Sequence, residues 1–337
     1  TGRRKRGFET DGEMRHANLA IFVPHLGCPN QCSFCDQHHI SGAEQPPTSE
    51  QVRQLCETVA GQLRGRYPDA EIAFFGGSFT AIDRVYMCEL LEAASPFVGE
   101  VFSGIRISTR PDAIDREVLG LLARYSVRSI ELGAQSMSDA VLRANSRGHT
   151  ALDVERASVL IQDAGFSLGL QMMTGLYRSD EQSDLETAKR LAALRPDTMR
   201  VYPTVVLEGT RLAALYRAGM YHPQSLEQAV GLGAQLLEFF DGQGIRVIRM
   251  GLHAQEELAA GQIAGPHHPA FRELCEGRLM EERLLSLLSG KPQGSYTACV
   301  SPKSISKVCG HGGQGIAKLR ALGYHIKVEQ DRLMSGL

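Results

Sequence analysis

The sequence predicts an α/β protein in which parallel strands alternate with helices, followed by a small β-α-α-β module at the C-terminus. Three observations support this prediction. Short apolar runs recur along residues 18–255, and longer amphipathic segments separate them. These helical segments are bounded by Gly, Pro or Ser, Thr and Asp caps. Residues 294–329 break the alternation, because two helical segments lie there between two strand-like runs.

The predicted strands of the first region are 19–24, 71–75, 104–109, 128–132, 167–172, 197–202 and 245–249. The predicted helices are 49–64, 83–95, 115–124, 138–145, 151–164, 181–194 and 225–241. Such alternation implies parallel strands joined by crossover helices, arranged either as a barrel or as a doubly wound sheet. Past Gly251 the alternation stops.

The C-terminal module is predicted as strand 295–300, helix 302–308, a Gly-rich turn at 310–313, helix 314–322 and strand 324–328. The expected organisation is therefore a basic and polar leader at residues 1–17, a barrel at 18–255, a segment with a lid or linker and a helix at 256–290, and a terminal module at 291–337.

Composition limits the cellular setting. The chain has 337 residues, of which 43% are hydrophobic, enough for one large core with a small appendage. Its longest apolar runs fall far short of the roughly 20 residues that a membrane span needs. The basic start TGRRKRG lacks the apolar stretch of a secretory signal. We therefore expect a cytoplasmic protein that is not associated with a membrane.

Cysteine usage and charge are both uneven. Three of the eight cysteines crowd into one loop and the others are scattered, which is not a disulfide framework and suggests a reducing compartment. The formal charge is −2, but residues 291–337 hold seven Lys and Arg against two acidic residues, so this tail carries +5 and the rest −7. The positive field is local to the C-terminus.

The cysteine loop HLGCPNQCSFC directly follows the first predicted strand and has the spacing Cys28-x₃-Cys32-x₂-Cys35. Thiolates are the ligands that iron–sulfur clusters prefer, and three of them leave one iron of a four-iron cluster without a protein ligand. An open position is what a catalytic metal needs. The alternative is a structural zinc knuckle with a fourth ligand from His38 or His39.

This loop, with Phe34 before the third cysteine, resembles the signature of the radical SAM superfamily. Further segments resemble that superfamily in the same order along residues 18–275, namely FGGSF, ISTRPD, ELGAQS, NSRGHT and RVYPTVVLEGT. The last four are similar to the catalytic subunit family of Elongator and also parallel the oxygen-independent coproporphyrinogen oxidase group. The resemblance implies a partial TIM-type (β/α)6 barrel.

The resemblance also implies a 4Fe-4S cluster on Cys28, Cys32 and Cys35, at which S-adenosylmethionine is cleaved reductively to give a 5′-deoxyadenosyl radical. A one-electron donor such as ferredoxin or flavodoxin would supply the electron. The implied cofactor residues lie in the matching segments: Phe34, Gly76, Gly77 and Ser78 near the cluster and the methionine amino group, Ser108 at the ribose, Arg147 at the carboxylate, Gln135 and Gln171 at the sugar and nearby polar groups, and Met173 at the adenine.

Several of these residues also have a structural interpretation. Gly76 and Gly77 could form an ordinary strand-to-helix turn, and Arg147 could be a surface residue after a short helix. Glu131 is expected either to pair with Arg110 or Arg147 or to make only a structural bond.

The segment GPHHPAF at residues 265–271 is a candidate lid over the barrel, since a radical must be shielded from water. Its His267 and His268 are candidates for a catalytic role, with a structural role as the alternative.

The tail is similar to a minimal KH fold, in which a GXXG turn clamps a nucleic-acid backbone. The corresponding residues are Gly310, His311, Gly312 and Gly313, with Lys303, Lys307 and Lys318 as further phosphate contacts. The alternative is a Gly-rich cap in a tail that packs on the barrel. Cys299 and Cys309 are expected to fill the core of this unit, whereas no role is evident for Cys56, Cys88 and Cys275.

We therefore predict a radical SAM enzyme that modifies a base in tRNA, rRNA or another structured RNA. Elongator-type enzymes use acetyl-CoA bound by a C-terminal domain, for which the fewer than about 70 residues after position 275 are too few. One alternative is a tetrapyrrole enzyme or haem chaperone related to coproporphyrinogen oxidase. Another is a non-catalytic RNA-binding protein with a structural or redox-sensing cluster.

Overall fold

The computed structural model describes residues 16–24, 26–28, 31–36, 45–63, 69–99, 101–252 and 260–331. The predicted leader up to residue 15 lies outside them. So do His38 and His39, which the zinc alternative requires.

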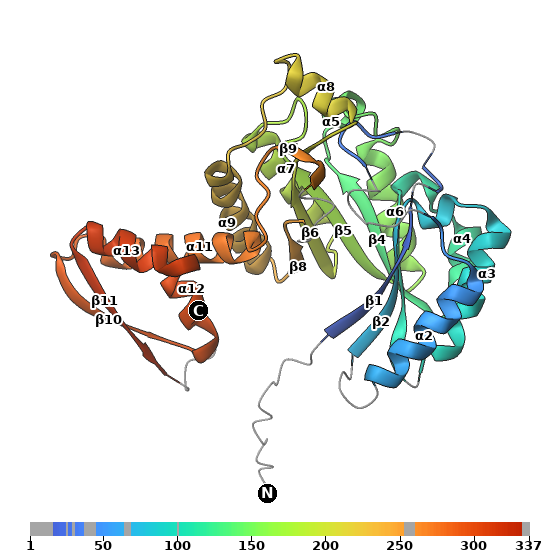
Figure 1. The fold of residues 1–337 in the computed structure, drawn as a ribbon, viewed down its shortest axis with the longest axis horizontal. Coiled ribbons are helices and arrows are strands. Elements are labelled where there is room, and N and C mark those ends of the chain that lie inside the picture. Colours follow the sequence, from blue (N-terminus) through green and yellow to red (C-terminus); the bar gives the residue numbers. More distant parts are fainter. Residues whose placement is uncertain are drawn as a thin grey trace, which may run out of the picture.

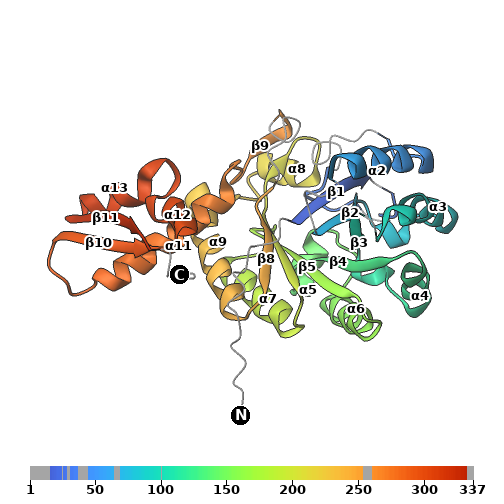
Figure 2. The same ribbon diagram turned by 90° about the horizontal axis from the view of Figure 1, so that it is seen from below.

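The body of the molecule is a sheet of seven parallel strands in the order β1-β2-β3-β4-β5-β6-β8, curled into a partial barrel (Figures 1 and 2). The strands are β1 (His16–Val23), β2 (Asp69–Gly76), β3 (Phe102–Thr109), β4 (Val127–Gln135), β5 (Ser167–Thr174), β6 (Thr198–Pro203) and β8 (Arg246–Met250). Each strand predicted for this region is confirmed, and of the two alternatives the barrel is correct. Because all strands are parallel and follow chain order, their C-terminal ends share one edge.

The helices of the barrel cover the outer face of the sheet (Figure 2). They are α2 (Ser49–Leu63), α3 (Arg84–Ala94), α4 (Arg116–Arg124), α6 (Ala151–Asp163), α7 (Glu181–Ala193) and α9 (Leu226–Gly242), with 3-10 turns at η1 (Phe79–Ala81), η2 (Ser95–Phe97) and η3 (Pro111–Ala113). The short helix α5 (Asp139–Ala144) lies instead at the C-terminal edge of the strands (Figure 1). Capping boxes fix the start of α6, α7 and α9. The sequence prediction missed α8 (Arg211–Arg217), because seven residues show too little periodicity.

The core lies between the sheet and these helices. Ile72, Phe74, Ile105 and Ile107 on β2 and β3 are fully buried, and they share one apolar cluster with Leu90 of α3. Each such side chain contributes about 1.5–3 kcal/mol when it leaves water. None of the helices in the described ranges is both long and apolar enough to cross a membrane.

Beyond β8 the chain forms a second unit around one long helix, α11 (Phe271–Leu288). It contains β10 (Gly294–Val300), η4 (Pro302–Ser304), α12 (Ile305–Cys309), η5 (His311–Gly313), α13 (Gln314–Ala321) and β11 (Tyr324–Gln330). The predicted order of strand, two helices and strand is confirmed, and β10 and β11 pair in parallel. Met280 of α11 packs with Val300 and Val308, so this helix completes the core of the module. The module stands beyond α9, at the far end of the sheet from β1 (Figures 1 and 2).

Asp184 of α7 is a buried carboxylate under the loop between β5 and α7. Its side chain accepts a hydrogen bond from the Gly175 amide at 2.8 Å, and the residue is 2% exposed. Burial raises its pKa from an ordinary value of 3.8 to about 7, against the opposing effect of the Gly175 amide. An acid whose pKa is higher in the folded state stabilises the fold at low pH, and this stability is lost as pH rises from about 4 to about 7.

In the wild type, the unfolding free energy should therefore fall by about 1.4 kcal/mol per pH unit between about pH 4 and pH 7. We expect Asp184→Asn to abolish this fall. Urea unfolding at pH 4, 5, 6 and 7 measures it. The variant should gain on the wild type as pH rises, and parallel profiles for the two proteins would contradict the shifted pKa.

Candidate functional site

The cysteine loop lies against the end of β2 through close backbone contacts. The amide of Gly77 donates to Val23 O at 2.8 Å, and the amide of Ser78 donates to Leu26 O at 3.1 Å. A Cβ on Gly77 would lie 2.0 Å from Leu26 O, so no other residue fits without moving the chain. The glycine pair therefore does more than turn the chain, because it seats the cysteine loop. Its predicted contact with the methionine amino group stays a prediction.

On its other side the loop is fixed by Asn145, which follows α5. The Ser33 hydroxyl donates to Asn145 Oδ1 at 2.7 Å, and the Ser33 amide donates to Asn145 O at 3.1 Å. Asn145 Nδ2 in turn donates to Val141 O at 2.8 Å and Tyr177 O at 2.9 Å. Asn145 is fully buried, and both the oxygen and the nitrogen of its side-chain amide form hydrogen bonds. Asn145 lies in the segment NSRGHT, but nothing in the sequence pattern predicts this role for it.

Phe34 and Met173 meet in a small apolar cluster beside the loop. Both are at most 9% exposed, and the cluster includes Cys32, with Cys35 packed against it. The structure thus brings Phe34 of the loop next to the end of β5, where Met173 lies. This fits their predicted place near the cofactor, which itself stays a prediction.

The three thiols of the loop influence one another. Burial raises the pKa of Cys28 and raises that of Cys35 to about 12, the neighbouring loop thiols add to both shifts, and the Arg147 guanidinium opposes them. Arg147 Nη1 donates to Cys32 Sγ at 3.2 Å. Neighbouring thiols beside a cation suit a cluster bound by thiolates. Within the described residues, however, no three His, Cys, Asp or Glu side chains already form a metal-binding group, so their role as ligands stays a prediction.

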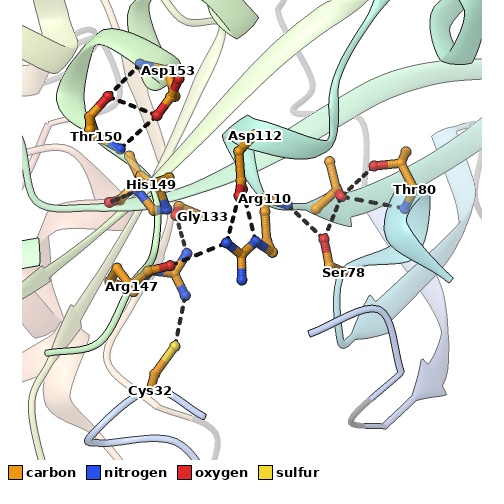
Figure 3. A network of polar contacts seen from close by, with 12 residues as sticks. Cys32, Ser78, Thr80, Arg110, Asp112, Gly133, Arg147, His149, Thr150 and Asp153 are labelled. Atoms are coloured by element: carbon orange, nitrogen blue, oxygen red, sulfur yellow. Dashed lines mark hydrogen bonds and ion pairs between the residues drawn. The ribbon is translucent and has the colours of Figure 1, made fainter. Parts of the chain in front are cut away.

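Arg147 is buried, with 8% of its surface exposed, so the alternative of a surface arginine is wrong. Its Nη2 donates to Gly133 O at 2.6 Å, and Figure 3 shows the guanidinium between this carbonyl and Cys32. Its Nε is buried without a hydrogen-bond partner. A buried donor left unpaired is costly, whereas a bound carboxylate would satisfy it. The donor thus fits the cofactor carboxylate that the resemblance places here.

Arg110, the residue that follows β3, supports this site. It forms two hydrogen bonds to Asp112, Nε to Oδ1 at 2.8 Å and Nη2 to Oδ2 at 2.6 Å, and it also donates to Arg147 O at 3.3 Å (Figure 3). The Arg110 amide donates to Ser78 Oγ at 3.1 Å, and this hydroxyl lies 2.9 Å from Thr109 Oγ1. The Ser78 side chain is therefore occupied in joining β2 to β3. Its amide is occupied as well, by Leu26 O, so a direct contact of Ser78 with a cofactor stays a prediction.

His149 lies behind Arg147 and is 3% exposed. One ring nitrogen, Nε2, lies 3.2 Å from Ala134 O, and the other, Nδ1, has no hydrogen-bond partner (Figure 3). Burial, assisted by the nearby Arg147, lowers its pKa to about 4. The ring is therefore neutral at neutral pH and adds no second charge to the site.

A bulge in β4 turns Gln135 toward the same place. The pairing with β5 shifts register between Gly133 and Gln135, and Gln135 has a φ of 64°. For a residue other than glycine this conformation costs on the order of 1–3 kcal/mol, and such strain concentrates at functional sites. The bulge lets Gln135 Oε1 accept a hydrogen bond from Gln171 Nε2 at 3.3 Å. The two predicted glutamines are thus brought together.

Glu131 pairs with neither Arg110 nor Arg147, and the structural alternative is correct. It forms ion pairs with Arg106, at 3.0 Å, and with Arg200, at 2.7 Å. Ser108, the predicted ribose contact, donates to the same carboxylate at 3.5 Å.

Glu131 and its two arginines belong to a row of four buried charged side chains that the sequence did not predict. We call this row, Glu71, Arg106, Glu131 and Arg200, the ladder. Arg106 also pairs with Glu71 at 2.6 Å, and Ser129 donates to Glu71 at 3.1 Å. Burial lowers the pKa of Arg200, but Glu131 and Tyr202 together outweigh this effect, so the net direction of the pKa shift is upward. The four side chains are at most 10% exposed. Polar residues at alternating positions of neighbouring strands were the available signal.

The candidate lid is tied to the barrel by a short antiparallel pair, β7 (Val206–Leu207) with β9 (Gln262–Ala264). In the segment that follows, His267 Nε2 is buried without a hydrogen-bond partner. His268 Nδ1 accepts from the Ala270 amide at 3.0 Å, and its ring stands edge-on to His311 at 5.3 Å. His268 thus contacts the C-terminal module, and a catalytic role for either histidine stays a prediction.

The predicted RNA-binding residues gather around the exposed turn of η5. Gly312 and Gly313 have positive φ angles of 60° and 77°. The side chain of Lys303 lies outside the described part. Two ion pairs join the other lysines to α11, Lys307–Glu276 at 3.6 Å and Lys318–Glu281 at 3.2 Å. His311 Nδ1 lies 3.6 Å from the Glu273 carboxylate, a contact that is ionic only when the ring is protonated. These cations stay about half exposed, and such surface pairs contribute only about 0–1 kcal/mol. Competing phosphates could therefore replace them.

Comparison with known proteins adds a second line of argument. Residues 22–191 match the family model of the radical SAM superfamily, and residues 196–281 match that of the Radical_SAM C-terminal domain. Elongator complex protein 3 of Saccharomyces cerevisiae is 30% identical over 251 residues, covering 65% of this chain and 44% of that protein. The tRNA uridine(34) acetyltransferase of Dehalococcoides mccartyi is 26% identical over 252 residues, covering 65% and 55%.

An uncharacterized protein of Methanocaldococcus jannaschii is 28% identical over 222 residues and covers 65% of each chain. The chain thus spans between 44% and 65% of the length of these three relatives.

Two solved structures share the fold. Elp3 of Methanocaldococcus infernus, without its N-terminal residues 1–46, matches 80% of this chain and 63% of its own with a TM-score of 0.62 at 20% identity. Coproporphyrinogen III oxidase of Escherichia coli matches 69% of this chain and 54% of its own with a TM-score of 0.50 at 20% identity. At such identities the likeness concerns the fold alone.

Replacing Asn145 tests whether it anchors the cysteine loop. We expect Asn145→Ala to lower the unfolding free energy by about 1–3 kcal/mol, because it strands the Ser33 hydroxyl and two backbone carbonyls. Iron bound per chain after anaerobic reconstitution should fall with it. Ser33→Ala is the matched control, since it removes only one of these bonds and should retain more iron. Equal iron content in Asn145→Ala and wild type would exclude the anchoring role.

Proposed function

Because this chain belongs to the radical SAM superfamily, we propose that it reductively cleaves S-adenosylmethionine at a 4Fe-4S cluster held by Cys28, Cys32 and Cys35 and thereby modifies a base in tRNA or another structured RNA. The observation that supports this most directly is the buried Arg147 guanidinium, which contacts Cys32 Sγ at 3.2 Å and keeps one N–H donor unpaired beside the thiols.

The residues of the chain would bind and orient the cofactors. When bound, the cluster would supply the one electron that cleaves the sulfonium of S-adenosylmethionine, releasing methionine and providing the 5′-deoxyadenosyl group as a radical that can take a hydrogen atom from the substrate. Arg147 would hold the carboxylate of S-adenosylmethionine, with Gly133 O orienting its guanidinium and Arg110 holding its backbone carbonyl. Gln135 and Gln171 would hold the sugar. The ladder from Glu71 to Arg200 would keep the barrel interior rigid beneath them.

RNA as the substrate class has two kinds of support. One named relative is a tRNA uridine(34) acetyltransferase, and Elongator complex protein 3 is another relative. The C-terminal module independently presents an exposed glycine turn beside His311 and Lys307. The tetrapyrrole alternative is supported only by likeness of fold to coproporphyrinogen III oxidase, so RNA is preferred. Acetyl transfer is not part of this proposal.

The cleavage step is tested with one cysteine variant. We expect anaerobically reconstituted wild type to form 5′-deoxyadenosine from S-adenosylmethionine and dithionite, and Cys32→Ser to form at least about 100-fold less, because one cluster ligand is lost. Cys299→Ser is the control and should match wild type, because Cys299 is exposed and the prediction that it fills the core of the tail is wrong. Zinc in place of iron, or full activity of Cys32→Ser, would refute the proposal. Nucleoside mass spectrometry of RNA from cells carrying either variant then identifies the modified base.

A charge placed in the glycine turn tests the RNA contact. Gly312→Asp should weaken retention of unfractionated tRNA in a gel shift at least about tenfold, since a carboxylate there repels phosphate. Cofactor cleavage without RNA should be unchanged. Gly165→Asp is the matched control, because Gly165 also has a positive φ, of 81°, and open space around it. It precedes β5 and so lies at the N-terminal end of that strand, away from the cysteine loop. Equal retention of tRNA by both variants would show that the glycine turn of the module does not contact RNA.

A further inference from the structure

A cavity of about 580 Å³ opens at the same end of the sheet as the cysteine loop. Its walls are the loop between β5 and α7, residues 175–181, and the segment before α9, residues 220–224, with Gln228 of α9. None of the residues that the resemblance assigns to the cluster or to S-adenosylmethionine lines it. Its volume lies within the range of about 300–1,000 Å³ that is typical of small-molecule sites.

Flat side chains form one side of this cavity. The rings of Tyr177 and Tyr221 meet edge to face at 6.3 Å, and the guanidinium of Arg178 lies 5.6 Å from the centre of the Tyr177 ring. Met220, at the rim, is 59% exposed. Aromatic rings and guanidinium planes of this kind are the surfaces on which unpaired RNA bases stack.

A hydrogen-bonding group without a partner completes the lining. Gln224 Oε1 is buried and has no partner, and it packs so closely on Gly175 that a Cβ there would lie 2.8 Å from it. The neighbouring Tyr221 hydroxyl is occupied, since it donates to Gly175 O at 2.6 Å. Burying an amide oxygen without a partner costs about 1–3 kcal/mol, which an N–H donor on a base edge would recover once the Gln224 side chain turned toward the cavity.

The charges favour a base over a phosphate. Arg178 is the one formal cation in the lining, against Asp180 and Glu181, so the wall carries a net charge of −1. Asp180 caps α7 by accepting from the Ser183 amide at 2.8 Å and stays ionised, because these hydrogen bonds lower its pKa. A phosphate would be repelled by this wall, whereas a neutral ring with N–H donors would not.

The cavity shares a wall with the cysteine loop. The carbonyl of Tyr177 accepts the hydrogen bond from Asn145 Nδ2 at 2.9 Å, and the same amide holds Ser33 of the loop. Tyr177 also packs against the apolar cluster that contains Cys32 and Phe34. A group bound in the cavity therefore lies beside the proposed reaction centre but outside it.

We propose that this cavity holds the base of one unpaired RNA nucleotide that neighbours the nucleotide to be modified. The base stacks on Tyr177 and Arg178 and donates to Gln224. This inference rests on the proposed function and deepens it, because it assigns to the barrel itself a contact that selects the RNA, in addition to any contact made by the C-terminal module.

The test uses the full chain and unfractionated tRNA in a gel shift. Arg178→Ala and Gln224→Leu should each weaken binding about tenfold, the effect of losing one base contact. Formation of 5′-deoxyadenosine without RNA should be unchanged in both. Arg156→Ala, at an exposed arginine of α6 far from the cavity, is the control and should bind like wild type. Arg178 is also exposed, so its variant remains informative if Gln224→Leu fails to fold.

The outcomes separate the two proposals. If wild type retains tRNA and both cavity variants retain it equally well, the cavity proposal is wrong while the proposed function stands. If wild type retains no tRNA, the cavity proposal fails together with tRNA as the substrate, whereas cleavage of S-adenosylmethionine is judged separately by the formation of 5′-deoxyadenosine. Weakening by Arg156→Ala to the same extent would indicate a general loss of positive charge and would also overturn the cavity proposal.

Discussion

The site depends on how one short loop is held from two sides. On one side Gly77 admits the backbone of the cysteine loop to a distance that no side chain would permit. On the other side the buried amide of Asn145 holds Ser33 and, through the same group, the carbonyl of Tyr177. The thiols are thereby set against Arg147, which β4 orients through Gly133 O. A loop of this length has no core of its own, so its shape is imposed by these neighbours.

Much of this architecture was predictable from local pattern. Apolar periodicity located every strand of the barrel, and the order of the motifs selected a barrel over a doubly wound sheet. The glutamines and Arg147 come together because each follows or ends a parallel strand. Contacts at long range were not predictable. Nothing local marks Asn145 as an anchor, and the partners of Glu131 lie on β3 and β6, far away in the sequence. The short helix α8 was not predicted, because its seven residues, about two turns, hold too little periodicity.

The polar interior explains why the strands were easier to locate than the contacts between them. Outward-facing positions such as Ile72 and Ile107 pack against helices and give a clear apolar signal. Inward-facing positions carry charge that is neutralised only after the sheet has curled, as with Glu71 and Arg106. Burying such charges is costly unless every partner is present. The ladder therefore requires the finished barrel, and a single strand does not reveal it.

The helix α11 belongs to two cores at once. Phe271 and Cys275 pack in the core of the barrel, whereas Met280 packs with Val300 and Val308. A rod of 18 residues is about 27 Å long. Because one helix is shared by both cores, it fixes the distance and the angle between the terminal module and the barrel. A polymer that bound both the barrel and the module would have to span the fixed distance between them. Long substrates could then be selected by the length of this span, without recognition of any base at the module.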